Sequence, residues 1–365
     1  MKESILYEKL PGTKVRCDVC ELRCVIPEGR RGVCQSRLNR GGTLFTLIYG
    51  KVASAFVDPI EKKPVYHFRP GTRILSLGTL GCNFRCPGCQ NWEISHNSPD
   101  ELGRNMRDLP PADAVELAVR SGCGAICWTY NDPTIWIEYT YDTAVVAKQR
   151  GLATAYITNG YATREQLDLI APVLDVWRVD LKGFSRQAYK EVTGIARWEA
   201  VLEMTKRARN VHHLWVECVT NVTPGINDSD ETLRGIANWI RTELGPDTPW
   251  HVTRFYPYLE LSHIPPTPIR TIERARAIGM EEGLRYVYVG NIPGHPGEDT
   301  YCHGCGERVI RRAGFAIAQA SLSDGLCPKC GTRIPGVFDA GGVARTSGDR
   351  KLLVAADFEP PVPER

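Results

Sequence analysis

The segment Leu80-Gly81-Cys82-Asn83-Phe84-Arg85-Cys86-Pro87-Gly88-Cys89-Gln90-Asn91-Trp92 places three cysteines within eight residues. An apolar run, residues 73–80, ends in this segment, and a helical segment follows it. The cysteines are therefore expected on a loop at the C-terminal end of a strand. In parallel α/β barrels, that end of the sheet carries the chemistry. The segment thus predicts a metal-binding loop at the functional face of such a fold.

The pattern of strand followed by helix repeats as far as residue 290. Short apolar runs predict strands at residues 73–80, 125–129, 154–158, 176–181, 215–220, 252–256 and 286–289. Helical periodicity marks residues 111–121, 135–149, 164–169, 230–244 and 271–282 between them. Such alternation is typical of a parallel sheet with crossover helices. Six or seven units predict an α/β fold, a partial TIM-like barrel of (β/α)6 type, because a closed eight-unit barrel needs about 250 residues.

Changes in composition divide the chain into four parts. Residues 1–70 form a lobe rich in cysteine, arginine and glycine, and residues 71–295 form the barrel. A turn-rich stretch after Gly290, residues 291–299, leads into the unit at residues 296–345, which contains the last cysteine group. The tail, residues 346–365, is polar and ends in Glu-Pro-Pro-Val-Pro-Glu-Arg, which predicts disorder.

The overall composition says little about binding partners but predicts the cellular compartment. The chain has 365 residues, 42% of them hydrophobic, and a net charge of +3, which gives no signal for binding nucleic acid or an anionic membrane. No apolar stretch reaches the roughly 18 residues of a membrane span, so we expect a cytoplasmic protein. Its 14 cysteines should then be reduced, and their clustering predicts metal binding or catalysis rather than disulfides.

The spacing Cys82-x3-Cys86-x2-Cys89 suggests an incompletely ligated [4Fe-4S] cluster. Such clusters normally take four thiolates, so three leave one iron open. An open iron can chelate the amino and carboxylate groups of a methionine moiety beside an electron source. Cleavage of the neighbouring carbon–sulfur bond then yields a carbon radical that a barrel must shield from water. The alternatives are a zinc knuckle with a distant fourth ligand or three core cysteines, although zinc sites favour paired cysteines.

These residues resemble the signature of the radical S-adenosylmethionine (radical SAM) superfamily, in particular its branch similar to pyruvate formate-lyase activating enzyme. Three further segments are similar to the radical enzyme of the AmmeMemoRadiSam system. They are Asp58-Pro59-Ile60-Glu61-Lys62-Lys63-Pro64-Val65-Tyr66-His67-Phe68, Thr129-Tyr130-Asn131-Asp132-Pro133-Thr134 and Tyr288-Val289-Gly290-Asn291-Ile292-Pro293-Gly294-His295. The resemblance covers about residues 17–337 and implies a [4Fe-4S] cluster with S-adenosylmethionine as cofactor.

The resemblance also implies cofactor-binding residues at successive strand ends. Asn131 and Asp132 would receive the methionyl amine, for which a carboxylate is a suitable acceptor. Thr158, Asn159, Asp180 and Lys182 would contact the ribose and the methionyl carboxylate. Taken singly, Asn-Asp-Pro is also a common turn, and Asp-x-Lys is often a solvated ion pair.

One position departs from the superfamily pattern. An aromatic or bulky residue usually precedes the third cysteine and packs on the adenine, whereas this chain has Gly88. Phe84, Trp92 or a residue from a later strand could supply that surface instead.

Two four-cysteine groups flank the barrel. Cys302-x2-Cys305 and Cys327-x2-Cys330 have the form of a two-knuckle zinc site, with rubredoxin-like iron as the rival. The other group has a less diagnostic spacing and predicts either zinc or a second iron–sulfur cluster; its members are Cys17, Cys20, Cys24 and Cys34.

The other cysteines and the histidines give weaker signals. The cysteines outside the three groups are interpreted as core residues of the strands; they are Cys123, Cys127 and Cys218. Among the histidines, His295 is kept as a candidate substrate contact because it lies in the last of the resembling segments.

Three functions are compatible with the sequence. The first is hydrogen abstraction from a protein, as in a glycyl radical enzyme activase. The second is modification of a small molecule or unusual residue together with Memo-like and AMMECR-type proteins. The third is a metal-bearing scaffold without turnover, which the intact cysteine loop disfavours. Either enzyme would need an electron donor of flavodoxin or ferredoxin type.

Overall fold

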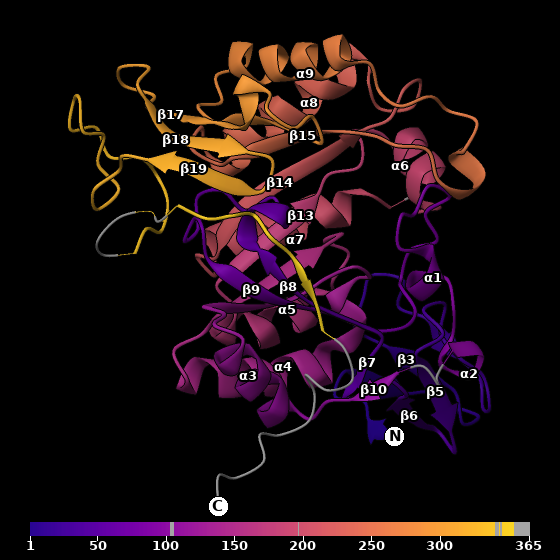
Figure 1. Ribbon diagram of the computed structural model, residues 1–365. Coiled ribbons are helices and arrows are strands. Elements are labelled where there is room, and N and C mark those ends of the chain that lie inside the picture. Colours follow the sequence, from indigo (N-terminus) through magenta and orange to yellow (C-terminus); the bar gives the residue numbers. More distant parts are fainter. Residues whose placement is uncertain (103–105, 196, 340–342, 344, 354–365) are drawn as a thin grey trace, which may run out of the picture.

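A nine-stranded sheet forms the centre of the computed structural model, which describes residues 1–102, 106–195, 197–339, 343 and 345–353 (Figure 1). Among these residues the strand order is β16-β15-β14-β13-β12-β11-β9-β8-β20. The first seven strands in this order run parallel to one another and follow the chain in sequence. They are β9 (Arg73–Gly78), β11 (Ala125–Trp128), β12 (Ala153–Thr158), β13 (Val176–Asp180), β14 (Trp215–Val222), β15 (Trp250–Arg254) and β16 (Val287–Gly290). The predicted strands and the partial barrel are therefore confirmed.

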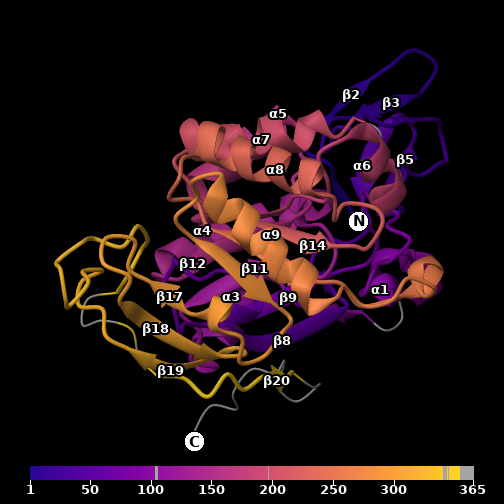
Figure 2. The ribbon, with the colours of Figure 1, turned by 90° about the horizontal axis from the view of Figure 1, so that it is seen from above.

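Helices connect the parallel strands and cover the sheet (Figure 2). They are α3 (Pro111–Arg120), α4 (Ile137–Gln149), α5 (Arg164–Ile170), α6 (Arg186–Thr193), α7 (Glu199–Asn210), α8 (Asp230–Trp239) and α9 (Ile269–Glu281). Several begin at a hydroxyl N-cap, for example Ser185, whose side chain accepts a hydrogen bond from the Ala188 amide. Each turns an apolar face toward the strands, as Leu167, Val201 and Ile236 do, and these side chains are fully buried. This packing makes one continuous core around the barrel.

Two antiparallel strands extend the sheet beyond the predicted barrel. β8 (Ser54–Pro59) pairs with β9, and β20 (Lys351–Leu352) pairs with β8. The expectation of a disordered tail was therefore wrong for Lys351–Leu352, while residues 354–365 of that tail lie outside the described residues. An ion pair of 2.9 Å between Arg350 and the fully buried Asp58 anchors the returning chain. The pairing gives the unpaired backbone groups of β8 hydrogen-bond partners. The sequence of a strand as short and polar as β20 does not predict such pairing.

Short strands build the N-terminal lobe. They are β1 (Lys2–Glu3), β2 (Tyr7–Lys9), β3 (Val15–Cys17), β4 (Val25–Ile26), β5 (Arg37–Arg40), β6 (Thr43–Thr46) and β7 (Lys51–Val52), the last of which pairs with β10 (Arg107–Asp108). Arg37 and Glu138, each 1% exposed, form an ion pair of 2.8 Å between this lobe and α4. A buried pair of this kind tolerates little displacement, because removing one partner leaves an uncompensated charge.

The C-terminal unit lies on the other side of the barrel from the N-terminal lobe, as Figures 1 and 2 both show. Its sheet contains β17 (Thr300–Tyr301), β18 (Arg308–Ala313) and β19 (Ala316–Ala320). Arg312 of β18 donates a hydrogen bond to the Tyr66 carbonyl, and His67 contacts the Pro335 carbonyl. Within the described part of the chain, no helix has both the length and the apolar character that a bilayer crossing requires.

Candidate active site

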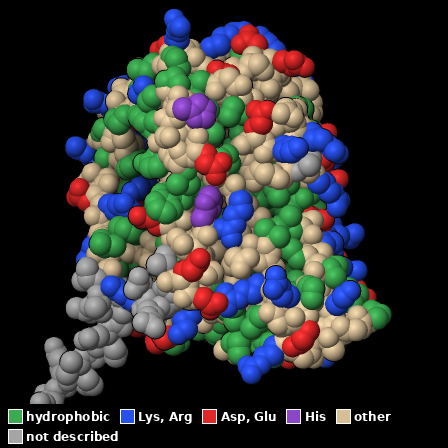
Figure 3. Space-filling view, turned by 90° about the vertical axis from the view of Figure 1, so that its right-hand side faces the viewer, with side chains coloured by type: hydrophobic (Ala, Val, Ile, Leu, Met, Phe, Trp, Pro, Cys, Tyr) green, Lys and Arg blue, Asp and Glu red, His purple; other side chains and the backbone are tan. Residues whose placement is uncertain are grey.

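A cavity of about 430 Å³ opens at the C-terminal ends of the parallel strands. Its wall includes all three cysteines of the loop after β9 and all six polar residues predicted to bind the cofactor. The latter are Asn131, Asp132, Thr158, Asn159, Asp180 and Lys182. The short helix α1 (Trp92–Ser95) and α6 lie on this side of the molecule (Figure 1). Acidic and basic side chains are both spread over that face (Figure 3).

The cysteine loop runs from β9 to α1 and turns its thiols toward the cavity. Cys82 is buried, and Cys86 and Cys89 are half-buried. Burial raises the pKa of the Cys86 thiol to about 11, while the nearby Lys182 ammonium opposes that rise. Burial likewise raises the pKa of Cys82. Coordination to a metal is the ordinary way in which such thiols become thiolates at neutral pH.

Asparagine side chains fix this loop to the neighbouring strand ends. Asn131, after β11, donates to the Gly81 carbonyl at 2.7 Å and accepts from the Thr79 amide at 3.1 Å. Asn159, after β12, donates to the Asn83 side chain at 2.8 Å. The cysteine loop therefore has a defined position relative to β11 and β12, which a reactive site requires.

Asp132 joins the ends of β11 and β12. One carboxylate oxygen accepts from the Thr134 amide at 2.9 Å, and the other accepts from the Thr158 hydroxyl at 2.9 Å and the Asn159 amide at 2.6 Å. Burial raises the pKa of Asp132, although these hydrogen bonds favour the charged form. A carboxylate offers about four acceptor positions, so this one can still accept one more hydrogen bond from a ligand.

A line of charged side chains follows the end of β13. Asp180 pairs with Lys182 at 3.0 Å and with Arg178, which also donates to the Lys63 carbonyl at 3.0 Å. Burial opposes ionisation of Asp180, but the two cations hold its pKa below the usual value. The pair is therefore an ion pair in the cavity wall rather than a solvated surface pair.

The space beside Gly88 is filled by a leucine. A Cβ atom on Gly88 would lie 2.9 Å from the Leu261 side chain, and Leu261 itself lines the cavity. The Glu260 amide donates to the Pro87 carbonyl at 3.0 Å, which holds that segment against the cysteine loop. An apolar surface thus occurs next to the third cysteine, but it comes from residue 261, far away in the sequence.

Three wall residues were not singled out by the sequence. Arg178 points into the cavity from within β13, and Glu61 and Tyr66 reach it from the segment after β8. Glu61 and Tyr66 lie in a segment quoted for its resemblance, which was the only available signal for them. His295, by contrast, contacts Glu273 at 3.3 Å and is not part of the cavity wall.

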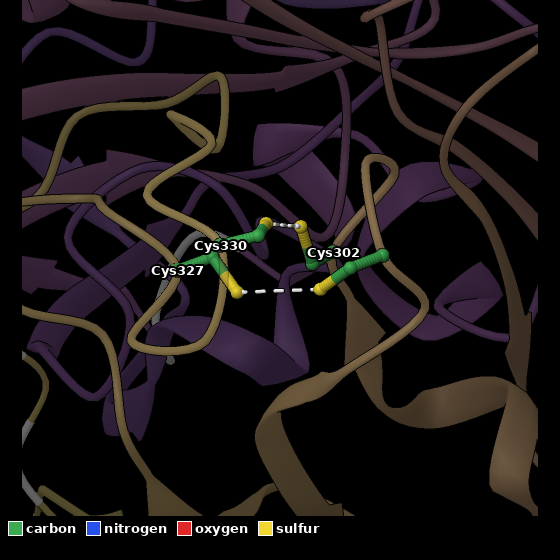
Figure 4. Close-up of side chains that lie close together, drawn as sticks. Cys302, Cys327 and Cys330 are labelled. Carbon is green, nitrogen blue, oxygen red and sulfur yellow. Dashed lines mark hydrogen bonds between the residues drawn. The ribbon is translucent and has the colours of Figure 1, made fainter.

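The C-terminal cysteines form a compact set of four. Their sulfurs all lie within 4.8 Å of one another, with 3.6 Å between Cys302 and Cys330 and 3.7 Å between Cys305 and Cys327 (Figure 4). Tetrahedral zinc with Zn–S bonds of about 2.3 Å needs a separation of about 3.8 Å between sulfurs. The arrangement therefore fits one tetrahedral ion.

The remaining seven cysteines fall into three core residues and the four-cysteine group of the N-terminal lobe, as the sequence predicts. Cys123, Cys127 and Cys218 are buried on or beside strands and pack in the core. The N-terminal group, whose members are Cys17, Cys20, Cys24 and Cys34, lines a small second cavity.

Comparisons with known proteins identify the class. A family model described as the radical SAM superfamily matches residues 77–240. The chain is 45% identical over 336 residues to the uncharacterized protein MJ0808 of Methanocaldococcus jannaschii, which covers 92% of this chain and 99% of that protein. It is also 28% identical over 104 residues to the choline trimethylamine-lyase activating enzyme of Oleidesulfovibrio alaskensis, covering 28% of this chain and 33% of that enzyme.

Two solved structures show a limited similarity to parts of the chain. A domain of pyruvate-formate lyase-activating enzyme from Bacteroides vulgatus gives a TM-score of 0.40 at 15% identity, covering 46% of this chain and 99% of that domain. Streptococcus suis SuiB bound to S-adenosylmethionine gives 0.48 at 13% identity, covering 67% of this chain and 56% of that one.

The chain belongs to the radical SAM superfamily. Within it, the chain shares a family with MJ0808 and is homologous to the activating enzymes of glycyl radical enzymes. It is accordingly a radical SAM enzyme, in which a [4Fe-4S] cluster and S-adenosylmethionine serve as cofactors for hydrogen abstraction.

Proposed function

We propose that Cys82, Cys86 and Cys89 hold the [4Fe-4S] cluster at the wall of the active-site cavity, with its open iron toward S-adenosylmethionine. The observation that supports this most directly is the shared cavity: three thiols and six polar side chains from successive strand ends surround one space. When bound, the cluster supplies one electron that cleaves S-adenosylmethionine to methionine and a 5'-deoxyadenosyl radical.

The three thiols of the loop are less compact than the C-terminal set. Among the described residues, the sulfurs of Cys82, Cys86 and Cys89 do not all lie within 4.8 Å of one another, whereas those of the C-terminal set do. The irons of a cubane occupy separate corners, so its thiolates stand farther apart than the ligands of one zinc ion. The zinc-knuckle alternative would also need a fourth ligand.

The polar side chains have complementary tasks in this proposal. Asn131 and Asp132 hold the loop and the ends of β11 and β12 in place, and the remaining acceptor capacity of Asp132 receives the methionyl amine. Asp180 accepts ribose hydroxyls, and Lys182 neutralises the methionyl carboxylate. Thr158 and Asn159 complete the polar wall, and Leu261 supplies an apolar surface for the adenine.

For the substrate, we propose the reaction of the AmmeMemoRadiSam system, with a Memo-like or AMMECR-type protein as partner. The three segments that resemble that system's radical enzyme all contribute to the cavity wall, through Glu61 and Tyr66, through Asn131, and through Gly290 and Asn291. Their place in the wall of the same cavity as the cysteine loop supports this proposal.

A second candidate is activation of a glycyl radical enzyme. Its support is the homology to the putative glycyl-radical enzyme activating enzyme MJ1632, at 23% identity over 191 residues, 50% of this chain and 68% of that protein. Both candidates need a one-electron donor, for which we propose a flavodoxin or ferredoxin. All fourteen cysteines are free thiols, which suits the reducing conditions of the cytoplasm.

A partner assay distinguishes the two candidates. The reduced, reconstituted protein is mixed with S-adenosylmethionine and then with a purified Memo-like protein, an AMMECR-type protein or a glycyl radical enzyme. We expect the first or second partner to increase 5'-deoxyadenosine formation, with no increase for the Cys86→Ala variant. An organic radical signal on the glycyl radical enzyme would favour activation, and no response to any partner would contradict both substrates.

For the C-terminal set we propose zinc in a structural role. The four sulfurs close the coordination sphere, and a closed site leaves no position for a substrate. The division at residues 70, 295 and 345 remains our proposal for the domains, with β8 and β20 as strands that the flanking parts contribute to the central sheet.

A further inference from the structure

The side chain of Ser95 contacts one of the three sulfurs of the active-site loop. Its Oγ lies 3.1 Å from the Sγ of Cys89. Ser95 is the last residue of α1 and is 2% exposed. Both residues contribute to the wall of the active-site cavity. The helix that follows the cysteine loop therefore brings a buried hydroxyl group back to the third cysteine of that loop.

This contact is not the usual hydrogen bond of a serine in a helix. Such a serine commonly donates to the carbonyl of the residue four positions earlier. In α1 that carbonyl belongs to Asn91, and it already accepts from the backbone amides of Ile94 and Ser95. Among the described residues, the hydrogen-bond partner of the Ser95 hydroxyl is the Cys89 sulfur. A buried hydroxyl needs a partner, so this sulfur accounts for the orientation of the side chain.

The cysteines of the loop differ in their polar neighbours. The Cys82 thiol donates to the Oδ1 of Asn83 at 3.6 Å, and that oxygen also accepts from the Asn159 side chain. An amide oxygen is an acceptor only, so it has no proton to offer a thiolate. A hydroxyl can donate as well as accept. Cys89 therefore has a neighbour that suits a deprotonated sulfur, whereas the neighbour of Cys82 suits a thiol.

Backbone hydrogen bonds hold α1 against the cysteine loop. The Gly81 amide donates to the Ile94 carbonyl at 2.9 Å, which closes the loop and the helix into a ring. Arg85, a member of that ring, donates to the Ser95 carbonyl at 3.2 Å. These contacts fix the position of the Ser95 hydroxyl relative to Cys89. A hydrogen bond that orients and adjusts a metal ligand requires such support.

We propose that the Ser95 hydroxyl donates a hydrogen bond to the Cys89 thiolate of the bound [4Fe-4S] cluster and thereby raises the reduction potential of that cluster. The inference rests on the proposed function, because it takes Cys89 as a cluster ligand. In the thiol form either group can donate, but a coordinated thiolate has no proton, so the hydroxyl must be the donor. Ser95 thus acts through Cys89, as a positioning residue.

The direction of the effect follows from charge. Reduction adds one electron to the cluster and makes its sulfurs more negative. A donated hydrogen bond therefore stabilises the reduced cluster more than the oxidised one, and hydrogen bonds to sulfur are among the factors that set cluster potentials. A flavodoxin or ferredoxin of given potential then reduces a larger fraction of the clusters. The electron passes on to the carbon–sulfur bond of S-adenosylmethionine, which breaks to leave methionine and a carbon radical.

A redox titration tests the effect of Ser95 on the cluster. The protein is reconstituted anaerobically, and the paramagnetic signal that Cys86→Ala removes is followed against the solution potential. At a fixed potential we expect Ser95→Ala to lower the ratio of reduced to oxidised cluster about tenfold, which is a shift of ~59 mV to more negative potential for a one-electron couple. Ser95→Thr keeps a hydroxyl and should restore most of the ratio. An unshifted midpoint in Ser95→Ala would overturn the proposal.

Ser76→Ala is the matched control for the loss of a buried serine. Ser76 of β9 is fully buried and accepts a hydrogen bond from the Cys127 thiol at 3.5 Å. Cys127 packs in the core and is not a proposed cluster ligand, so removing this hydroxyl should leave the midpoint unchanged. A shift as large as that of Ser95→Ala would show that the potential responds to packing in general, and would contradict the role of Ser95.

Electron–nuclear double resonance detects the hydrogen bond itself. In heavy water the Ser95 hydroxyl carries a deuteron, and the reduced cluster should show a deuteron coupling that is lost in Ser95→Ala and retained in Ser76→Ala. Absence of such a coupling from the parent protein would overturn the proposal without recourse to any variant. A parent protein that lacks any cluster signal dependent on Cys86 would contradict the proposed function instead. A cluster with the same midpoint and couplings in the parent and Ser95→Ala would contradict only the role of Ser95.

Discussion

Glu61 combines a place in the cavity wall with an unsatisfied polar atom. Its Oε1 accepts from the Gly71 amide at 2.8 Å, while its buried Oε2 has no hydrogen-bond partner. Burial raises its pKa from 4.5 to about 7, against the attraction of Arg312. The carboxyl group therefore changes protonation near neutral pH and can either donate to a substrate or accept from one.

The raised pKa of Glu61 predicts a pH-dependent loss of stability. The folded protein binds this proton more tightly than the unfolded chain, so the free energy of unfolding should fall as pH rises from 4.5 to about 7. Above that range the full cost, on the order of 3 kcal/mol, is present. Denaturant titrations of Glu61→Gln across this range should show a smaller fall than the parent protein; parallel pH profiles would refute the assignment.

Lys182 should matter for binding the cofactor. Its ammonium pairs with Asp180 in the cavity wall, and burial without that partner would disfavour its charge. Hydrogen bonds to charged groups contribute about 1.5–3 kcal/mol, so Lys182→Met should raise the KM for S-adenosylmethionine about tenfold or more. Lys190→Met changes an exposed lysine on α6 and serves as the control. Steady-state kinetics that show equal KM values for both variants would contradict the role.

The turn between β9 and the cysteine loop depends on Gly81. Its backbone has a φ of +85°, a left-handed conformation that side chains disfavour. The Cys34 carbonyl also occupies the place of a Cβ atom, at 2.2 Å. Glycine here allows the N-terminal lobe and the active-site loop to touch.

Gly81→Ala should therefore destabilise the protein more than backbone strain alone. Gly122 is the matched control, because it has a similar φ of +67° and open space around its Cβ position. Each alanine costs about 1 kcal/mol or more in strain, but only the one at position 81 adds a clash. Thermal unfolding and bound iron should both decrease further in Gly81→Ala. Equal effects in the two variants would show that the contact is unimportant.

The sequence predicted those elements whose signal is local. Parallel strands such as β11 and β12 are buried on both faces and therefore read as short apolar runs, which is why their positions were predicted to within a residue or two. β20 has two residues, Lys351 and Leu352, and both are exposed. It exists because β8 offers an unpaired edge, which no local pattern reveals.

The same reasoning applies to the site. The cysteine loop and the polar residues at strand ends were predictable, because the C-terminal ends of parallel strands meet at one edge. Arg178 was not, because its side chain enters the cavity from within a strand that reads as core. Leu261 was not, because its contact with Gly88 joins residues far apart in the chain.

A buried polar network joins the barrel to both flanking segments. Glu217 of β14 accepts hydrogen bonds from the amides of Tyr66 and His67 and contacts His251 at 2.7 Å. His67 in turn contacts Tyr288 of β16 and the Pro335 carbonyl. These contacts connect the segment after β8, the barrel and the C-terminal unit, so they hold that unit against the barrel.

Loss of the proposed C-terminal metal should loosen that unit alone. Cys327→Ser removes one ligand, and hydrogen exchange should then accelerate in β17, β18 and β19. Exchange in β11 to β13 should stay slow, because those strands lie in the barrel core. Mass spectrometry of the exchanged peptides checks both regions. Unchanged exchange in β18 and β19 would contradict a structural role for the metal.

Formation of 5'-deoxyadenosine tests the central claim most directly. The anaerobically reconstituted protein is reduced with dithionite and given S-adenosylmethionine, beside a Cys86→Ala variant and a Cys123→Ala control. We predict methionine and 5'-deoxyadenosine in equal amounts from the parent and the control, and none above background from Cys86→Ala. Cleavage retained by Cys86→Ala would contradict a catalytic cluster held by the loop after β9.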